Sequence, residues 1–335
     1  MVDLCNEAKS VVTPLISALY NTAENKLPAV LSQVLHADCD IHFTHPIEDL
    51  TGPVSFYESA YKPLLKAIPN LERRDYITIA GEVNDQIWVG CAGFYSGNFV
   101  SPWLDIPSTM QVAYLRFHEF YRVQENKVVE IQAVWDIPAL MMQAGAWPMA
   151  PAIGVEWLVP GPATQDGKVL SPRDVTKSDA STQLVADMLQ GLAKFSTGGV
   201  DAMQLDRYWH QAFYWYGPAG IGSCCGINGF RTCHQIPFLN AMPDRVGSGD
   251  TGYLFGDGDY VGYTGWPGMK MTLSADGWMG IAPCNKKITM RSLDFWRCEN
   301  GLIRENWVLI DLLDVYDQLG VNVFNRMREL TLHRR

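Results

Sequence analysis

Acidic residues accompanied by arginines recur at matched positions in the two halves of this chain. At an offset of 175 residues, one set of side chains meets its twin: Arg116, Glu130 and Asp136 against Arg291, Glu305 and Asp311. A carboxylate in an apolar pocket can take a proton from carbon beside a carbonyl and return one to a developing alkoxide, because desolvation raises its pKa toward neutrality. The same carboxylate can instead form an inert cross-strand ion pair. Both interpretations stay open for the acids of this set.

Histidines are the second group of candidates. His118 lies on a predicted strand where the second half has Leu293, so the fold does not require it in both halves. It could donate to a substrate carbonyl, or it could be a half-buried histidine satisfied by backbone. His42 and His45 have a spacing sometimes seen in metal sites, but we identify no acidic or cysteine partner nearby in the sequence, so no metal is expected.

The matched positions extend along the whole chain, which is therefore a tandem duplication. At an offset of 174 residues without a gap, four residues of the first half recur in the second: Gly52, Phe56, Pro63 and Pro69 meet Gly226, Phe230, Pro237 and Pro243. Solenoid repeats are much shorter, about 20 to 50 residues, so the copied unit is a domain.

Composition limits the class of protein and its partners. The chain has 335 residues, 47% of them hydrophobic and 19% charged, which is typical of a compact soluble protein with two domains. A net charge of −10 argues against nucleic-acid binding. No secretory signal and no membrane-spanning segment is apparent, so a cytoplasmic protein is expected. Its eight cysteines are irregularly spaced and are expected to be reduced thiols.

Each copy shows helical periodicity first and strand-like segments afterwards. A helix is predicted over 54–67, with its twin over about 228–241. The strand-like segments of the first copy are 76–79, 86–91, 110–123 and 128–135. Residues 149–181 are rich in proline and small polar residues and are predicted to be a linker between a first domain at 8–148 and a second at 182–330. This order predicts an α+β fold in which a curved antiparallel sheet closes over helices.

The last two strands of each copy predict a hairpin with a defined register. If the turns centre on Asn126 and Gly301, four arginines face four acids across the strands. The expected pairs are Arg116 with Asp136, Arg122 with Glu130, Arg291 with Asp311 and Arg297 with Glu305.

The segment from Arg297 to Gly320 resembles the closing motif of SnoaL-like polyketide cyclases, a branch of the nuclear-transport-factor-2-like superfamily. Its elements are an arginine before a glycine turn, then Glu305, Trp307 and Asp311, then the run from Gln318. The first copy carries a worn version with Gln132 in place of the tryptophan. The resemblance implies two cone-shaped α+β barrels, each a bent sheet wrapped around helices and an apolar pocket. Such domains commonly pair through their sheets, so an intramolecular pseudo-dimer is expected, and homo-oligomerisation stays open.

The resemblance also implies a function, because family members close rings by aldol chemistry without metal or cofactor. Carried over to this chain, the acid–base residue is Asp311, with Asp136 as its counterpart. Trp307 would wall the pocket, and His234 could point into it. Aromatic residues suit a flat ligand, and three are chosen as pocket lining: Tyr216, Tyr263 and Trp266.

The expected function is thus a cofactor-independent cyclase, lyase or isomerase acting on an apolar carbonyl compound. One alternative is a non-catalytic protein that binds a small molecule. A further alternative is a hydrolase of a small ester or glycoside that uses the same carboxylates.

Overall fold

The computed structural model describes residues 3–22, 25–247 and 249–334, and the chain divides into two compact units. Unit 1 comprises Met1–Pro148, Thr164–Pro172 and Asn322–Arg335, and unit 2 comprises Met149–Ala163 and Arg173–Val321. The two units have the same α+β architecture, as the duplication predicts. No helix in the described ranges is both long and apolar enough to cross a membrane.

The unit boundaries differ from the predicted linker. Thr78 of unit 1 donates its backbone N–H to Gly167 O at 2.9 Å, so part of the 149–181 segment belongs to unit 1. Helix α6 begins inside the same segment, at Val175, where Asp174 accepts from the backbone N–H of Lys177 at 3.0 Å. This N-cap starts the helix directly after a proline-rich stretch, which conceals it in the sequence.

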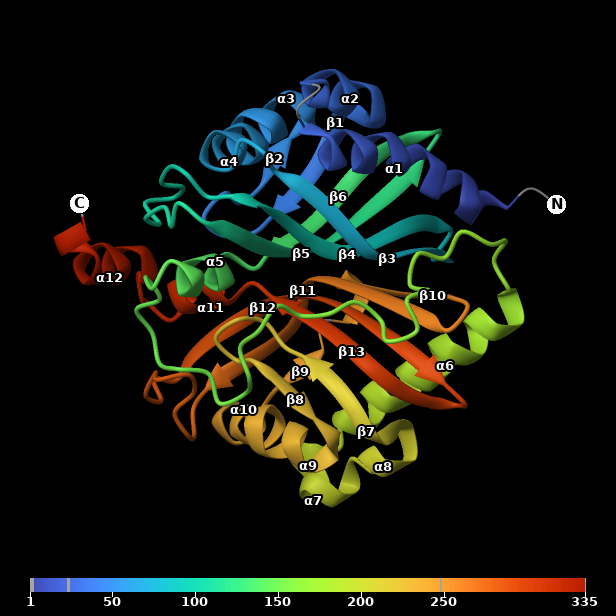
Figure 1. Ribbon diagram of the computed structural model, residues 1–335. Helices are drawn as coiled ribbons and strands as arrows, with labels where there is room; N and C mark the ends of the chain where they lie inside the picture. Colours follow the sequence, from blue (N-terminus) through green and yellow to red (C-terminus); the bar gives the residue numbers. More distant parts are fainter. Residues whose placement is uncertain (1–2, 23–24, 248, 335) are drawn as a thin grey trace. The chain divides into compact units, whose positions relative to one another are not determined.

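In unit 1, helices α1 to α4 lie over one side of the sheet (Figure 1). The order of the elements is α1 (Leu4–Tyr20), α2 (Leu27–Val34), β1 (Leu35–Phe43), β2 (Leu50–Thr51), α3 (Gly52–Phe56), the π-helix η2 (Tyr57–Tyr61), α4 (Lys62–Ala67), β3 (Glu72–Val83), β4 (Gln86–Asn98), β5 (Val112–Gln124), β6 (Lys127–Trp135), α5 (Ile137–Gln143), α12 (Val323–Leu330) and η5 (Leu332–Arg334).

Unit 2 repeats this order with one added short helix, α7, after its first long helix, and with β9, η4 and β10 where unit 1 has the single strand β3. Its elements are α6 (Val175–Leu192), α7 (Phe195–Ala202), α8 (Leu205–Tyr208), β7 (Trp209–Tyr216), β8 (Ser223–Cys225), α9 (Gly226–Phe230), the π-helix η3 (Arg231–Gln235), α10 (Ile236–Ala241), β9 (Val246–Gly247), η4 (Gly249–Thr251), β10 (Gly252–Asp257), β11 (Tyr260–Leu273), β12 (Lys286–Glu299), β13 (Leu302–Ile310) and α11 (Leu312–Gln318).

Both sheets are mixed, whereas an antiparallel sheet was expected. The strand order is β2-β1-β6-β5-β4-β3 in unit 1 and β10-β11-β12-β13-β7-β8 in unit 2, with β9 beside β11. The parallel pairs are β1 with β6 and β7 with β13. They arise because β1 and β7, which the sequence reading missed, return to the last strand of each unit. The pairing of the two units as a pseudo-dimer stays a prediction.

The predicted helices at 54–67 and 228–241 are confirmed, and each contains a π-turn at its centre. Pro63 and Pro237 follow these turns directly. Because proline has no N–H to donate, the regular ladder of i to i−4 hydrogen bonds cannot continue through it. The π-turn of unit 2 carries His234 and Gln235, so it sets the direction of both side chains.

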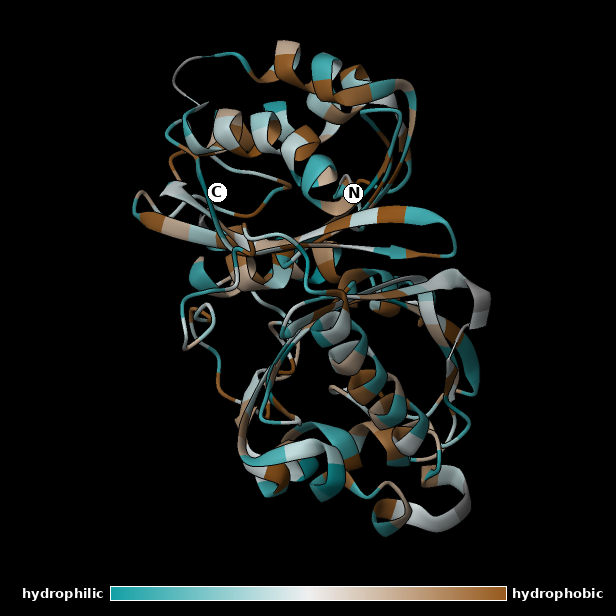
Figure 2. Cartoon of the chain, turned by 90° about the vertical axis from the view of Figure 1, so that its right-hand side faces the viewer, coloured by the Kyte–Doolittle hydropathy of each residue, from teal (hydrophilic) through white to brown (hydrophobic). Residues whose placement is uncertain are grey.

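The predicted hairpin register is confirmed along the strands, and it shifts by one residue next to each turn, after Arg122 and after Arg297. Arg122 pairs with Glu130 and Arg297 with Glu305 across the strands. Alternation then divides each strand between two faces, one toward the helices and one away from them. The helices themselves carry both apolar and polar residues (Figure 2), and on α1 the residues at helical spacing from Ala8 through Val12 and Leu15 to Leu19 are buried. Which side chains share the inner face of the sheet decides the candidate site.

Candidate active site

Unit 2 contains a cavity of about 120 Å³ between the inner face of its sheet and its helices. The helices contribute mainly aliphatic and aromatic side chains, among them Met188, Leu192, Phe230 and Phe238. The last two long strands contribute every second residue, namely Ser292, Asp294 and Trp296 from β12 and Asn306, Val308 and Ile310 from β13. A largely apolar hollow with a few polar groups is the usual form of a small-molecule site.

The cavity exists because unit 2 has different residues at positions that unit 1 fills. The strand registers show which positions of the two units correspond. Arg73 and Tyr95 face each other in unit 1, and Gly247 and Met269 occupy the same two positions in unit 2. Likewise Phe117 faces Trp135, and Ser292 faces Ile310. At the end of the π-turns, Tyr61 corresponds to Gln235. A guanidinium, two phenol rings, a phenyl ring and an indole are thus replaced by mostly smaller groups.

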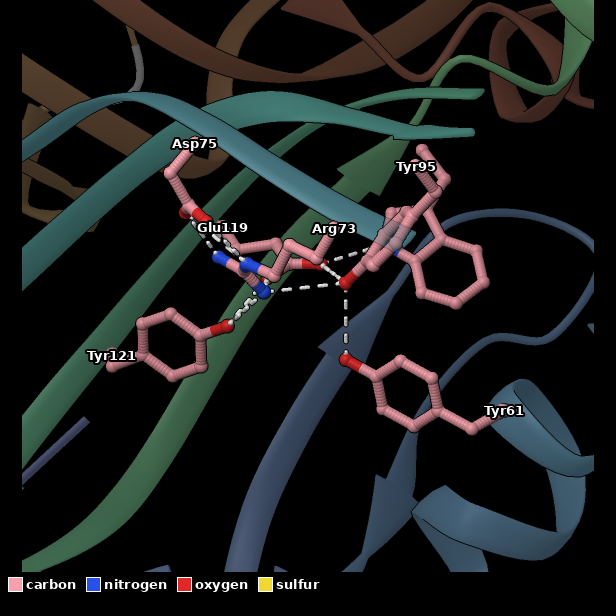
Figure 3. Close-up of polar contacts among 7 residues, drawn as sticks. Tyr61, Arg73, Asp75, Tyr95, Glu119 and Tyr121 are labelled. Atoms are coloured by element: carbon pink, nitrogen blue, oxygen red, sulfur yellow. Dashed lines mark hydrogen bonds and ion pairs between the residues drawn. The ribbon is translucent and has the colours of Figure 1, made fainter. Parts of the chain in front are cut away.

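In unit 1 the same interior holds a buried polar network centred on Arg73 (Figure 3). Arg73 lies 2.5 Å from Glu119 and 2.9 Å from Asp75, and all three side chains are at most 1% exposed. Glu119 also accepts from Tyr95 at 2.9 Å, from Tyr121, and from Trp135 Nε1 at 2.8 Å. Tyr61 and Tyr95 join through their hydroxyls at 3.3 Å.

Electrostatics explain why this network is closed. Burial alone would lower the pKa of Arg73, but the charges of Asp75 and Glu119 hold it well above its usual value. Burial and the charge of Glu119 raise the pKa of Tyr95 well above its usual value. Arg73 therefore stays charged and Tyr95 stays protonated. The phenols and the guanidinium form hydrogen bonds and ion pairs with both carboxylates. The carboxylates are therefore bound to the protein's own groups and are not available to a ligand.

His234 borders the cavity of unit 2, as the sequence reading suggested. Its ring stacks on Trp215, with centroids 4.2 Å apart and planes 13° from parallel, and Nδ1 is buried without a hydrogen-bond partner among the described residues. Burial, assisted by the charge of Arg245, lowers the pKa of His234 to about 3. The imidazole is neutral at physiological pH and can accept or donate one hydrogen bond without carrying charge.

Four further buried polar atoms around the cavity have no hydrogen-bond partner in the part of the chain that the structure describes. They are Trp209 Nε1, Gln235 Oε1, Arg245 Nε and Trp296 Nε1. Buried polar atoms in native proteins are almost always paired, so a group of them around one cavity indicates a missing partner. A bound ligand with complementary polar groups would supply one.

Asp294 is the carboxylate of this cavity. It lies on β12 between Ser292 and Trp296, and Ser292 Oγ donates to it at 3.2 Å. The corresponding residue in unit 1 is Glu119, the acid of the buried network. Glu119 pairs with Ala133 across β5 and β6, and Asp294 pairs with Val308 at the same positions of β12 and β13. The sequence reading missed this pair because it compared only identical residues. An acid preserved as an acid in both copies was the signal available.

Asp311 and Asp136 occupy helix N-caps and do not line the cavity. Asp311 accepts from the backbone N–H of Asp314 at 3.3 Å and lies 3.0 Å from Arg291 Nη1. The backbone N–H of Asp136 donates to Arg116 O at 2.8 Å. For Asp311 this geometry is the ion-pair alternative set out above, and a carboxylate that caps a helix and holds a guanidinium has a sufficient structural role.

Trp307 and Tyr216 lie outside the cavity because strand alternation turns them to the opposite face of the sheet. Asn306 and Val308 border the cavity, so Trp307 between them cannot; its Nε1 donates to Pro160 O at 2.9 Å. Tyr216 donates to Glu305 at 3.1 Å, and its ring lies 5.3 Å from that of Trp307. The prediction that these two rings line the pocket is wrong, because the cavity is lined by the residues next to them in each strand, which point to the other face of the sheet.

The remaining predicted pocket residues are not among those that line the cavity, although Tyr263 on β11 pairs directly with Asp294 on β12. Trp266 stacks on the guanidinium of Arg291 at 4.7 Å, and Tyr263 donates to Gly268 O at 3.4 Å; neither borders the cavity. His118 of unit 1 is fully buried, with Nε2 3.4 Å from Arg116 Nη2, on the face of β5 opposite Glu119.

His42 and His45 do have acidic partners, contrary to the sequence reading. Their Nδ1 atoms lie 3.0 Å from Asp49 and 2.8 Å from Glu48. These are separate pairs, and in the described ranges no cluster of three or more His, Cys, Asp or Glu residues is arranged to hold a metal ion.

The low pKa of His234 makes stability depend on pH. The pKa of His234 in the folded protein, about 3, lies below the ordinary pKa near 6.5. Between these two pH values the histidine is protonated in the unfolded chain and neutral in the folded chain. The stabilisation is complete above about pH 6.5 and is lost as pH falls toward 3. Between about pH 7 and 5 the wild type should therefore lose roughly 2 kcal/mol more than His234→Phe. Urea unfolding at both pH values measures this, with His36→Phe, an exposed histidine, as the control. Equal losses in all three proteins would contradict it.

No curated protein matches the chain. Among solved structures, wild-type IdmH from Streptomyces antibioticus is 14% identical, with a TM-score of 0.34, over 41% of this chain and 98% of its own. TsrD from Streptomyces laurentii is 16% identical, with a TM-score of 0.34, over 42% and 95%. An NTF2-like protein from Burkholderia xenovorans LB400 is 12% identical, with a TM-score of 0.32, over 42% and 96%.

The family itself is shown by the sequence match. The profile of the SnoaL-like polyketide cyclases matches twice, over residues 14–144 and 186–319, which together cover more than half of the chain and fall on the two copies of the fold. The chain belongs to the SnoaL-like polyketide cyclase family, as a tandem duplication of its domain.

Proposed function

We propose that unit 2 is a cofactor-independent enzyme of the cyclase, lyase or isomerase type, acting on an apolar carbonyl compound held in its cavity. The observation that carries the proposal is the cavity itself: aromatic and aliphatic walls, one carboxylate, and five buried polar atoms without partners among the described residues. The substrate would supply the missing hydrogen bonds, and its flat apolar body would stack on the aromatic walls.

Asp294 is the proposed acid–base residue in place of Asp311. Its carboxylate would take a proton from carbon beside the substrate carbonyl, and the C–H bonding pair would move to the carbonyl oxygen as an enolate. In a cyclase the enolate carbon would then attack a second carbonyl, and Asp294 would return its proton to the new alkoxide. Asp294 is half-buried, and a substrate seated against the apolar walls would exclude water from its carboxylate, which favours this role.

His234 is proposed to position the substrate without exchanging protons. With a pKa of about 3 it is too weak a base for the chemistry at neutral pH. Its stacked ring and unpartnered Nδ1 instead offer one directed hydrogen bond within the aromatic wall.

Filling the cavity tests the proposal. Unit 1 has Phe117 at the position of Ser292, so Ser292→Phe should place a ring in the space that the substrate needs, at a cost of about 1–3 kcal/mol of stability. Wild type, Ser292→Phe and the exposed control Ser274→Phe would each be incubated with a metabolite extract, and retained and converted compounds identified by mass spectrometry. We expect a compound that wild type and Ser274→Phe convert and Ser292→Phe does not.

Two other outcomes decide against the proposal. Retention without conversion would indicate a binding protein. The same retained and converted compounds with Ser292→Phe as with wild type would show that the cavity is not the site.

A further inference from the structure

The guanidinium of Arg245 enters the wall of the unit 2 cavity from the turn between α10 and β9. One of its terminal nitrogens, Nη2, donates to the carbonyl of Leu192 at 3.4 Å, and its Nε is buried without a partner among the described residues. Within those residues no carboxylate lies at ion-pair distance from Arg245, and burial lowers its pKa. A largely buried cation without an anion is unfavourable, and proteins rarely retain one unless something else supplies the charge.

The contrast with unit 1 shows what is absent. There the interior arginine, Arg73, holds Asp75 at 2.9 Å and Glu119 at 2.5 Å. The position that matches Asp75 at the offset of 174 residues is Gly249. Unit 2 therefore presents a guanidinium to its interior without the acid that unit 1 provides for the same purpose.

Two indole groups strengthen this pattern. Trp209 Nε1 and Trp296 Nε1 border the same cavity, are buried, and have no partner in the described part of the chain. Indole and guanidinium N–H groups can only donate hydrogen bonds. Three unpartnered donors around one small space call for a ligand rich in acceptor oxygens.

We propose that Arg245, with Trp209 and Trp296, binds an oxyanion on the ligand of this cavity, a carboxylate or an enolate carried by a flat apolar body. The inference rests on the proposed function, because it assumes that the cavity is a ligand site. In the reaction proposed above, Asp294 becomes neutral when it accepts the proton, and the negative charge appears on the substrate oxygen. The guanidinium of Arg245 can then stabilise the enolate as it forms.

Small aromatic probes that differ in one group test the inference. Benzoate presents a carboxylate, 4-nitrophenolate stands in for an enolate, and benzyl alcohol keeps the ring without the charge. Calorimetric titration of the intact protein, at a pH where 4-nitrophenol is ionised, gives the three affinities. We expect at least one oxyanion to bind about tenfold or more tightly than benzyl alcohol, because a hydrogen bond to a buried charged donor is strong. The better of the two anions identifies the class of ligand.

Arg245→Met assigns the effect to the guanidinium. The preference for the oxyanion should vanish while the affinity for benzyl alcohol is kept, and Arg207→Met, an exposed arginine of the same unit, should leave both unchanged. The wild-type comparison stands even if Arg245→Met does not fold. Benzyl alcohol bound as tightly as both anions overturns the inference and leaves the proposed function intact. A preference that survives Arg245→Met overturns the assignment to Arg245. Wild-type protein that binds none of the probes overturns the inference and counts against the cavity as a ligand site.

Discussion

Replacing Arg73 by methionine should lower the free energy of unfolding of unit 1 by about 3–5 kcal/mol. The methionine keeps most of the apolar stem, but the guanidinium that holds Asp75 and Glu119 is lost. Two carboxylates then remain in an interior where each side chain is only 1% exposed, and the phenols of Tyr95 and Tyr121 can satisfy only Glu119. Removing one partner from a buried ion pair is far more damaging than never having had the pair.

Denaturant unfolding measures this loss, and the neighbouring arginine provides the control. Arg74 forms an ion pair with Glu72 at 2.9 Å, but its side chain is 57% exposed. Arg74→Met should therefore change stability by at most about 1 kcal/mol. Combining Arg73→Met with Asp75→Asn and Glu119→Gln should recover part of the loss, because the unpaired charges are gone. Arg73→Met as stable as Arg74→Met would show that the network is not what holds this interior together.

Replacing Asp294 by asparagine should lower the turnover number about 10²- to 10⁴-fold on the compound that the metabolite experiment identifies. Asparagine has the same shape and can still accept the hydrogen bond from Ser292, but it cannot take a proton from carbon. Substrate affinity should change little, because the apolar walls and the other polar groups of the cavity remain. Steady-state kinetics together with direct titration separate the two quantities.

Asp311→Asn is the informative comparison, because Asp311 was the acid expected from the family motif. It should lower stability through the helix cap and the pair with Arg291, and leave turnover per folded molecule unchanged. Asp276→Asn, an exposed change in the same unit, should alter neither. Turnover that collapses in Asp311→Asn and survives in Asp294→Asn would return the acid–base role to Asp311.

Features that depend on the pattern of residues along one strand or helix could be predicted from the sequence. The duplication, the helices at 54–67 and 228–241, and the hairpin pairing of Arg297 with Glu305 all follow from spacing and turn chemistry, whereas the π-turns inside those helices were not predicted. The parallel pairing of β1 with β6 was missed because it joins strands far apart in sequence, and no local pattern specifies such a contact.

Asp311, Trp307 and Tyr216, which were expected at the site, do not line the cavity. Arg291 and Asp311, which match between the copies, and Trp307 of the closing motif hold the sheet and its closing helix in place, whereas the cavity is bordered by their neighbours Ser292, Asn306 and Ile310. His234 does border the cavity, because its place on the helix does not depend on strand alternation, and its role in binding stays a prediction. Residues that survive in both copies report what the fold requires, while a pocket that differs between the copies is found among residues that do not match.

The two interiors also differ in how they can change over evolutionary time. An arginine at Gly247 would enter a space without the acids that Arg73 has in Asp75 and Glu119, and losing Arg73 alone would strand those acids. Exchanging the arginine or its acids one at a time would therefore give a poorly folding intermediate. Converting one interior into the other therefore requires the arginine and both of its acids to change together.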